Sequence, residues 1–248
     1  MPLGPSYDGW ILRYRHSAGD FHLVEPTPPS GPVTLELSQY KGEIVPSGTM
    51  VTDSWSPSAN HLLLCLVHIR GSQSPSGHVT GVSGNGLTWT KKTEKDDTQN
   101  SLCFQVWWAL GSPSVGAVTL ALNFLTVNIG VQLLSFSNVN LTTPLGNVAN
   151  VDTGSTDTNT GNVNLTTSAN NSKIVMHAVN RNQVPSVPGG SIFSPVLVNQ
   201  KIDSGGNIGT SSSWLSSEIA TSGTVQNCLF NLSSAGDWAM GAVEILGT

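Results

Sequence analysis

The chain has 248 residues, enough for one large domain or two small ones. Only 10% of the residues are charged, against a typical share of about 25%, whereas Gly, Ser, Thr and Asn are abundant. Coiled coils and helical bundles are excluded because their outer helix faces need many Glu, Lys and Arg side chains. The net charge of −5 supplies no basic field for a nucleic acid. We therefore expect an all-β protein.

The first segment, residues 1–45, is rich in proline and differs from the rest of the chain. Apolar stretches at 10–14 and 21–24 lie on either side of a turn sequence, which predicts a short hairpin on an extended arm. An isolated hairpin is marginally stable in water, so we expect this one to dock on another surface. The side chains expected to bind a partner are Trp10, Ile11, Leu12, Arg13, Arg15, Phe21 and Leu23.

From residue 46 to 248, short apolar runs alternate with turn-forming clusters, which is typical of an antiparallel sandwich. The strands expected in chain order are residues 61–69, 87–93, 102–109, 117–122, 128–136, 173–179, 214–220, 225–232 and 238–246. In 102–109, the alternation favours the face of Leu102, Phe104 and Trp108 as the core face. His177 alternates with apolar residues and is interpreted as a hydrogen-bonded core histidine.

The polar segment 152–161 is too poor in apolar residues for a buried strand. It is predicted to be an exposed loop or edge strand and a contact surface. Its Asp157-x-Asn159-x-Gly161 pattern resembles the start of a calcium loop, but the register is wrong and no Glu closes it.

No motif with catalytic or metal-binding spacing occurs, so we expect no enzyme activity, no metal and no cofactor. Cys65, Cys103 and Cys228 lie in apolar runs and are interpreted as buried, unpaired thiols. Of the seven Trp residues, Trp55 and Trp214 are flanked by Ser-rich sequence and are the candidates for an exposed glycan-binding platform.

The chain resembles the β-sandwich domains of tailed-bacteriophage virion proteins, which include capsid decoration (cement) proteins and tail-associated modules. The segments that carry the resemblance are VSGNGLTWT at 82–90, VWWA at 106–109, AVTL at 117–120, LLSFSNV at 133–139 with PL at 144–145, and DWAMGAVEI at 237–245. The resemblance implies a jelly-roll-like sandwich and a virion context, and it carries no active-site residue.

We therefore expect an antiparallel jelly-roll-like β-sandwich over residues 46–248, with an extended N-terminal arm over residues 1–45. The expected function is that of a non-enzymatic virion structural protein, a capsid cement or decoration subunit that stabilises the phage head. The expected partners are the major capsid protein or another virion protein and further copies of the chain in a homotrimer, with no nucleic acid and no membrane. No signal peptide is recognisable, so the protein is expected to be made in the host cytoplasm and to reside in the virion.

Two alternatives stay open. One is a carbohydrate- or receptor-binding tail or fibre module, whose site would lie in the loops around Trp55, residues 152–161 or residues 205–214. The other is a glycan-degrading tail enzyme, because the sequence does not reveal the distance between any two of the 15 acidic side chains.

Overall fold

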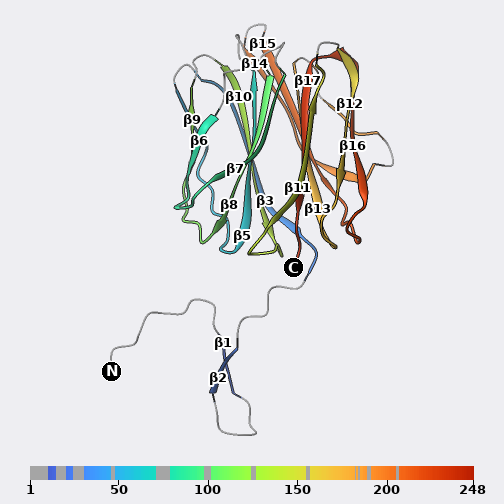
Figure 1. Cartoon of the computed structure of the whole chain (residues 1–248). Coiled ribbons are helices and arrows are strands. Elements are labelled where there is room, and N and C mark those ends of the chain that lie inside the picture. The colour runs from blue at the N-terminus through green and yellow to red at the C-terminus, as the bar shows by residue number, and fades with distance from the viewer. Residues whose placement is uncertain are drawn as a thin grey trace.

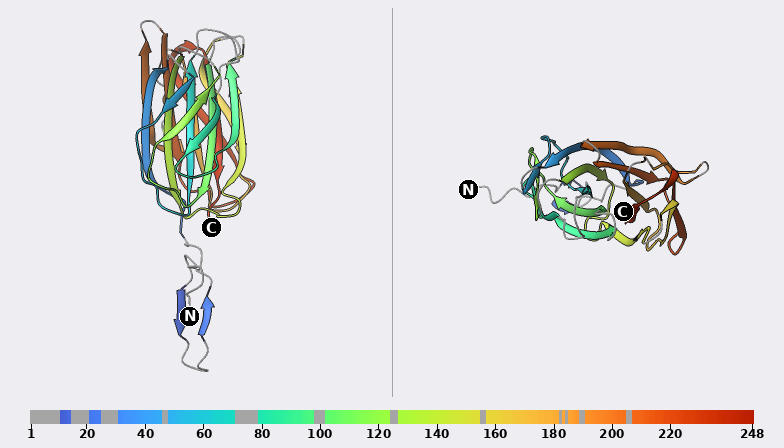
Figure 2. Two further views of the ribbon diagram at one scale, coloured as in Figure 1. Left: turned by 90° about the vertical axis from the view of Figure 1, so that its left-hand side faces the viewer. Right: turned by 90° about the horizontal axis from the view of Figure 1, so that it is seen from above.

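The computed structural model describes residues 11–14, 21–24, 31–45, 48–70, 79–97, 102–123, 127–154, 157–181, 183, 185–188, 191–204 and 207–248. Within these ranges the chain forms strands and turns and no helix. All the strand pairs are antiparallel, which confirms the predicted all-β antiparallel sandwich. The strands run along the long axis of the molecule (Figures 1 and 2).

Residues in the first half of the chain form two sheets. The five-stranded sheet has the order β3-β10-β5-β8-β7, and the three-stranded sheet has the order β4-β9-β6. The strands are β3 (Thr34–Val45), β4 (Thr49–Val51), β5 (His61–Arg70), β6 (Val79–Gly84), β7 (Thr90–Asp97), β8 (Leu102–Gly111), β9 (Val118–Leu122) and β10 (Val127–Ser137).

The second half repeats this arrangement. Its five-stranded sheet has the order β11-β17-β13-β15-β14, and β12 pairs with β16 in a two-stranded sheet. The strands are β11 (Leu145–Asp152), β12 (Thr158–Thr166), β13 (Lys173–Asn180), β14 (Phe193–Ser204), β15 (Asn207–Ser216), β16 (Val225–Gly236) and β17 (Trp238–Ile245).

The two halves correspond strand by strand. If β11 is matched to β3, β13 to β5 and β17 to β10, the two five-stranded sheets have the same order. Asn60 and Asn171, which precede β5 and β13, both have positive φ angles, of 61° and 54°. Asn tolerates this left-handed conformation better than most residues because its side chain bonds locally. The described strands therefore form a topological duplication, in which the second half has one strand fewer than the first.

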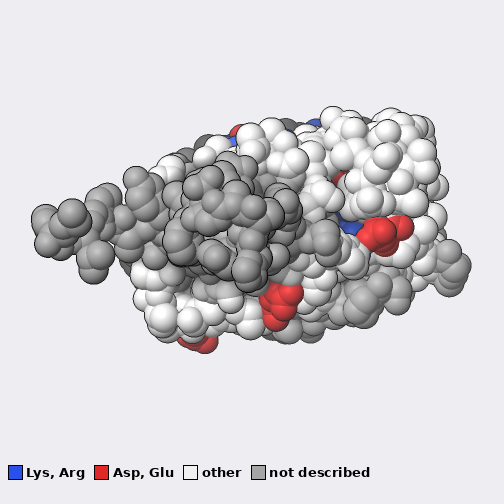
Figure 3. Space-filling model, turned by 90° about the horizontal axis from the view of Figure 1, so that it is seen from below, with Lys and Arg blue, Asp and Glu red and all other residues white. Residues whose placement is uncertain are grey.

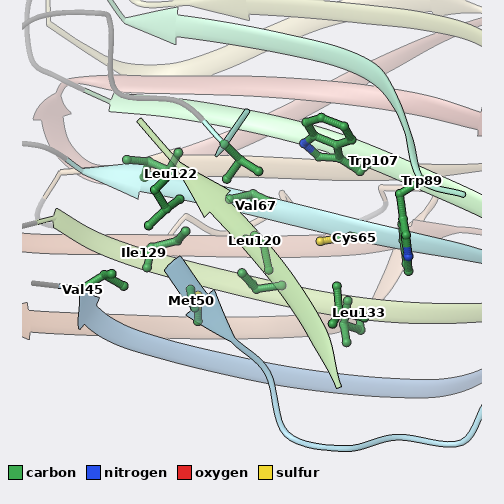
Figure 4. Packing of buried hydrophobic residues seen from close by; sticks show 14 of the residues in the cluster. Val45, Met50, Cys65, Val67, Trp89, Trp107, Leu120, Leu122, Ile129 and Leu133 are labelled. Atoms are coloured by element: carbon green, nitrogen blue, oxygen red, sulfur yellow. The ribbon is translucent and has the colours of Figure 1, made fainter. Parts of the chain in front are cut away.

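Four sheets are stacked face to face, with the β6–β9 sheet on one side and the β12–β16 sheet on the other (Figure 1). The first core lies between the three-stranded sheet and the first five-stranded sheet. In Figure 4, Met50, Leu120 and Leu122 of the three-stranded sheet lie beside Ile129, Cys65 and Val67 of the five-stranded sheet there. The second core lies between the two five-stranded sheets, and the third lies between the second of these and the β12–β16 pair.

The stacking buries both faces of the two middle sheets. Leu102, Phe104 and Val106 of β8 belong to the second core, whereas Cys103 and Trp107 belong to the first. The face predicted as the core face is therefore buried, and the opposite face is buried as well, because this strand lies in an inner layer. Full burial of each Leu or Phe contributes about 1.5–3 kcal/mol relative to exposure.

The sandwich begins earlier than predicted. β3 lies within the range assigned to the arm, yet it pairs with β10 from Thr34 to Val45. The side chain of Val33 is fully buried in the second core. Residues 33–45, which the sequence assigned to the arm, therefore belong to the stacked sheets.

Candidate functional site

The predicted hairpin is formed by β1 (Ile11–Tyr14) and β2 (Phe21–Val24), which pair antiparallel with Leu12 opposite Leu23. This pairing places the backbones of five of the predicted arm residues, Ile11, Leu12, Arg13, Phe21 and Leu23. Trp10 and Arg15 lie outside the described residues. Whether these residues bind a partner stays a prediction.

The predicted glycan platform is wrong. Trp55 is only 7% exposed and its indole Nε1 donates a hydrogen bond to Oδ1 of Asn85 at 2.8 Å. Trp214 is 0% exposed and belongs to the third core. Neither indole face is open to a sugar ring. Sequence reasoning missed this because Ser-rich flanks also occur on β15, a strand buried between two other strands.

The three cysteines lie where the sequence predicts. All are free and buried. Burial raises the pKa of the Cys228 thiol to about 12 and raises the pKa values of Cys65 and Cys103 as well. These thiols therefore stay protonated at neutral pH and behave as small apolar side chains.

The calcium pattern does not form a loop. β12 begins at Thr158, so Asn159 and Gly161 lie within a strand, and Asn159 is exposed. Gly161 leaves room for the ring of Phe230 from the partner strand. Across the described part of the chain, no group of three or more His, Cys, Asp or Glu side chains is arranged to hold a metal ion.

A polar cavity of about 120 Å³ lies where the ends of β13 and β16 meet the start of β12. It contains one residue of the predicted contact segment, Asp157. The other cavity residues come from the far end of the sequence and carry no local motif, so sequence reasoning missed them. The lining residues are Asp157, Asn180, Arg181, Gln183, Ala235, Gly236 and Asp237.

Hydrogen bonds fix the walls of this cavity. Nδ2 of Asn180 donates to the backbone oxygen of Asp237 at 2.5 Å, and Oδ1 of Asn180 accepts from the backbone N–H of Gln183 at 2.6 Å. Nη1 of Arg181 forms an ion pair with Oδ2 of Asp237 at 3.3 Å. Arg70 of β5 donates to the backbone oxygen of Arg181 at 3.0 Å, so the first half of the chain also holds the cavity wall.

The carboxyl group of Asp237 is the perturbed acid of this cavity, and Asp157 lines the cavity with it. The pKa of Asp237 is raised to about 6, mainly by burial and also by the neighbouring carboxyl groups of Asp157 and Asp97, and the hydrogen bond from Arg181 only partly opposes this rise. The lining therefore offers carboxyl, amide and guanidinium groups that can hydrogen-bond to a polar ligand.

Replacing Asp157 with asparagine is expected to stabilise the fold at pH 7.5. The raised pKa of Asp237 means that the native state binds more protons than the unfolded state between about pH 4 and 6, so its contribution to stability falls as the pH rises through this range. Removing the neighbouring charge should raise the urea midpoint at pH 7.5 by roughly 0.3 M and leave it unchanged at pH 4.5. Asp152→Asn is the control, because Asp152 pairs with Lys95 at 3.1 Å instead. A gain for Asp157→Asn at both pH values would show that repulsion between the charges of Asp157 and Asp237 is not its cause.

His177 is buried, as predicted, with 2% of its surface exposed. The predicted hydrogen bond is absent, since neither ring nitrogen has a partner among the described residues. The reason is that the sheet facing His177 presents mainly apolar side chains.

No family model, curated protein or solved structure matches this chain. In the described ranges no helix is long and apolar enough to span a bilayer.

Proposed function

We propose that the chain is a non-enzymatic virion structural protein, a capsid cement or decoration subunit of a phage head that assembles as a homotrimer. The observation that carries the proposal is a stack of four sheets preceded by a separately paired N-terminal hairpin. In this proposal the stack is the rigid body on the particle surface, and the hairpin is its anchor.

The strand order supports the jelly-roll part of the proposal. With eight strands numbered along the chain, a jelly roll pairs strands 1-8-3-6 in one sheet and 2-7-4-5 in the other. β3-β10-β5-β8 and β4-β9-β6 follow this order, except that β7 pairs with β8. Jelly rolls recur in viral capsids and lectins, so this is support by analogy of fold.

The described surface also suits a particle exterior. Seen from below, charged side chains are sparse between uncharged ones (Figure 3). The outward positions of β12 are Thr160, Asn162, Asn164 and Thr166, all of them exposed, uncharged and hydrogen-bonding. Such a surface tolerates wide variation in salt because few of its contacts are ionic.

The anchor would bury apolar side chains of the hairpin against the shell, at about 25 cal/mol per Å² of apolar area. Arg13 and Arg15 would meet acidic groups of the major capsid protein. Both are expectations from the sequence.

Deleting residues 1–30 is expected to abolish binding to particles that lack the protein and to leave the stacked sheets folded. The deletion ends before Val33, because that side chain belongs to the second core. Binding is measured by co-sedimentation with particles, folding by circular dichroism, and mass by light scattering. A Leu12→Asp, Leu23→Asp double variant tests the hairpin alone, because these residues are paired in it. A trimer in both full-length and truncated chains supports the proposal, and unchanged particle binding by the truncated chain overturns the anchor.

The second candidate function is a carbohydrate- or receptor-binding tail module. The cavity at Asp157 favours it, because that residue lies in the predicted contact segment and the lining offers carboxyl, amide and guanidinium groups to ligand hydroxyls. A monomeric mass together with particle binding that is independent of residues 1–30 would favour this function over the first.

A further inference from the structure

The contact between the two five-stranded sheets holds two histidines in an otherwise largely apolar core. His68 lies near the end of β5, and His177 lies in the middle of β13. His68 is 1% exposed and His177 is 2% exposed. The surrounding apolar residues of this core include Leu66, Phe104 and Val179.

His68 is fitted against the backbone of its own sheet. Its register partners are Gly130 on β10 and Phe104 on β8. A Cβ atom at Gly130 would overlap the imidazole ring and lie 2.6 Å from the hydroxyl oxygen of Tyr40. Neither Nε2 of His68 nor the Tyr40 hydroxyl has a hydrogen-bond partner among the described residues.

His177 faces the same core from the opposite sheet. Its register partners are Gly241 on β17 and Ser213 on β15. A Cβ atom at Gly241 would overlap the ring of Phe104, the neighbour of His68, so the two histidines flank one aromatic side chain. The ring centroids of His177 and Phe104 are 6.4 Å apart, and the two rings meet edge to face.

The described titratable groups on the packed elements do not compensate a positive charge on either ring. β3 presents the hydroxyl of Tyr40, and Lys95 of β7 is paired with Asp152 of β11. Arg70, Arg181 and Asp237 interact with one another at the end of the contact. Asp97 of β7, which is fully buried, accepts from Thr153. Gln132 of β10 and Ser213 of β15, which hydrogen-bond across the gap, are neutral.

We propose that His68 and His177 form an acid-sensitive latch between the two sandwiches, in which the neutral rings pack between the sheets and protonation places two cations in the apolar gap and separates the halves. The pKa of each ring is lowered to about 3, for His177 by burial and for His68 by burial together with the neighbouring His177.

Proton linkage determines in which direction the stability of the contact changes with pH. Because the native pKa lies below the unfolded value of about 6.5, the unfolded or opened state binds more protons, and the latch weakens as the pH falls from about 6.5 to 3. At pH 5 each histidine should shift the opening equilibrium by about 30-fold relative to a residue that does not titrate, and the pair by about 1000-fold. Asp237 titrates over part of this range with the opposite sign, so the latch is tested by comparing variants.

The test compares the full-length chain with His68→Gln, His177→Gln and the double variant by urea unfolding at pH 7.5 and 5.0. The double variant is expected to lose most of the roughly 1000-fold increase in the unfolding constant between these pH values. The glutamine side chain itself destabilises the fold, because it leaves buried polar atoms without partners. This loss is the same at both pH values, so it cancels when the two unfolding constants of one variant are compared. His61→Gln is the control, because His61 is only partly buried and bonds to Ser135 Oγ at 2.9 Å. A double variant that keeps the wild-type pH dependence would overturn the latch.

A second measurement needs no variant. Proton NMR of the unaltered chain should show two imidazole C2–H signals that do not shift between pH 7.5 and 5.5, and titration of all its histidines near 6.5 would overturn the proposal. On further acidification, binding of a hydrophobic dye should rise while the far-ultraviolet strand signal persists, because the sheets separate before they unfold. Simultaneous loss of the strand signal would instead assign plain acid unfolding and overturn the latch.

Discussion

Replacing Glu244 with glutamine is expected to destabilise the fold by about 2 kcal/mol, and replacing it with alanine by about 4 kcal/mol. Glu244 lies on β17 and is 0% exposed. Its oxygens accept hydrogen bonds from the backbone N–H groups of Asn147 at 3.0 Å, Ser168 at 2.9 Å and Ala169 at 3.3 Å, and from Oγ of Ser168 at 2.7 Å. One carboxylate thus ties β17 to β11 and to the loop before β13.

The loss should depend on pH. Burial by itself raises the pKa of Glu244, but the hydrogen bonds from Ser168 and Asn147 outweigh it and hold the pKa below its usual value. A carboxyl group with a depressed native pKa stabilises the fold above its unfolded pKa of about 4.3, and this contribution is lost as the pH falls through the native pKa. The difference between Glu244→Gln and the unaltered chain is therefore expected to be full at pH 7 and smaller at pH 3.

Urea unfolding at the two pH values checks this. Glu218→Gln is the matched control, since Glu218 is exposed and should change the stability by less than about 0.5 kcal/mol. If Glu244→Gln lowers the free energy of unfolding equally at pH 7 and pH 3, the packing of the side chain rather than its negative charge stabilises this site.

Replacing Gly241 with alanine is expected to destabilise the fold by about 3 kcal/mol, which lowers the melting temperature by roughly 9 °C for a chain of this size. The added Cβ atom would overlap the ring of Phe104, which is 0% exposed in the second core and has no space to retreat. The strain should appear as an earlier thermal transition in calorimetry.

Two comparisons isolate the cause. Gly81→Ala is the control, because its Cβ atom would have no neighbour within 4 Å, and we expect a change of less than about 0.5 kcal/mol. Combining Gly241→Ala with Phe104→Leu should cost less than the sum of the two single changes, because the smaller side chain removes the overlap. Strict additivity would contradict the proposed contact.

Apolar runs were sufficient to predict the inner strands. β5, β10, β13 and β17 match the expected ranges to within two residues, because continuous apolar sequence bounded by turn residues is typical of buried strands. Two edge strands without such a run, β3 and β12, were missed for the same reason. β3 carries Glu36, Leu37 and Ser38 in exposed positions, and β12 is mostly Asn and Thr, so neither has an apolar run. The strand expected at 87–93 begins later, because Leu87 donates to Gly84 in a turn.

The sequence by itself determined the all-β class, the buried state of the three thiols and the inner strands, because these follow from composition and local period. Only the tertiary structure decided that two duplicated sandwiches stack face to face and bury both faces of β8. Contacts between distant residues decided the rest: Trp214 is enclosed by the third core, Asp237 meets Asp157 across 80 positions, and His177 faces a core without a hydrogen-bond partner. Such contacts depend on how many layers the chain forms and on their register, and no local pattern of residues encodes either.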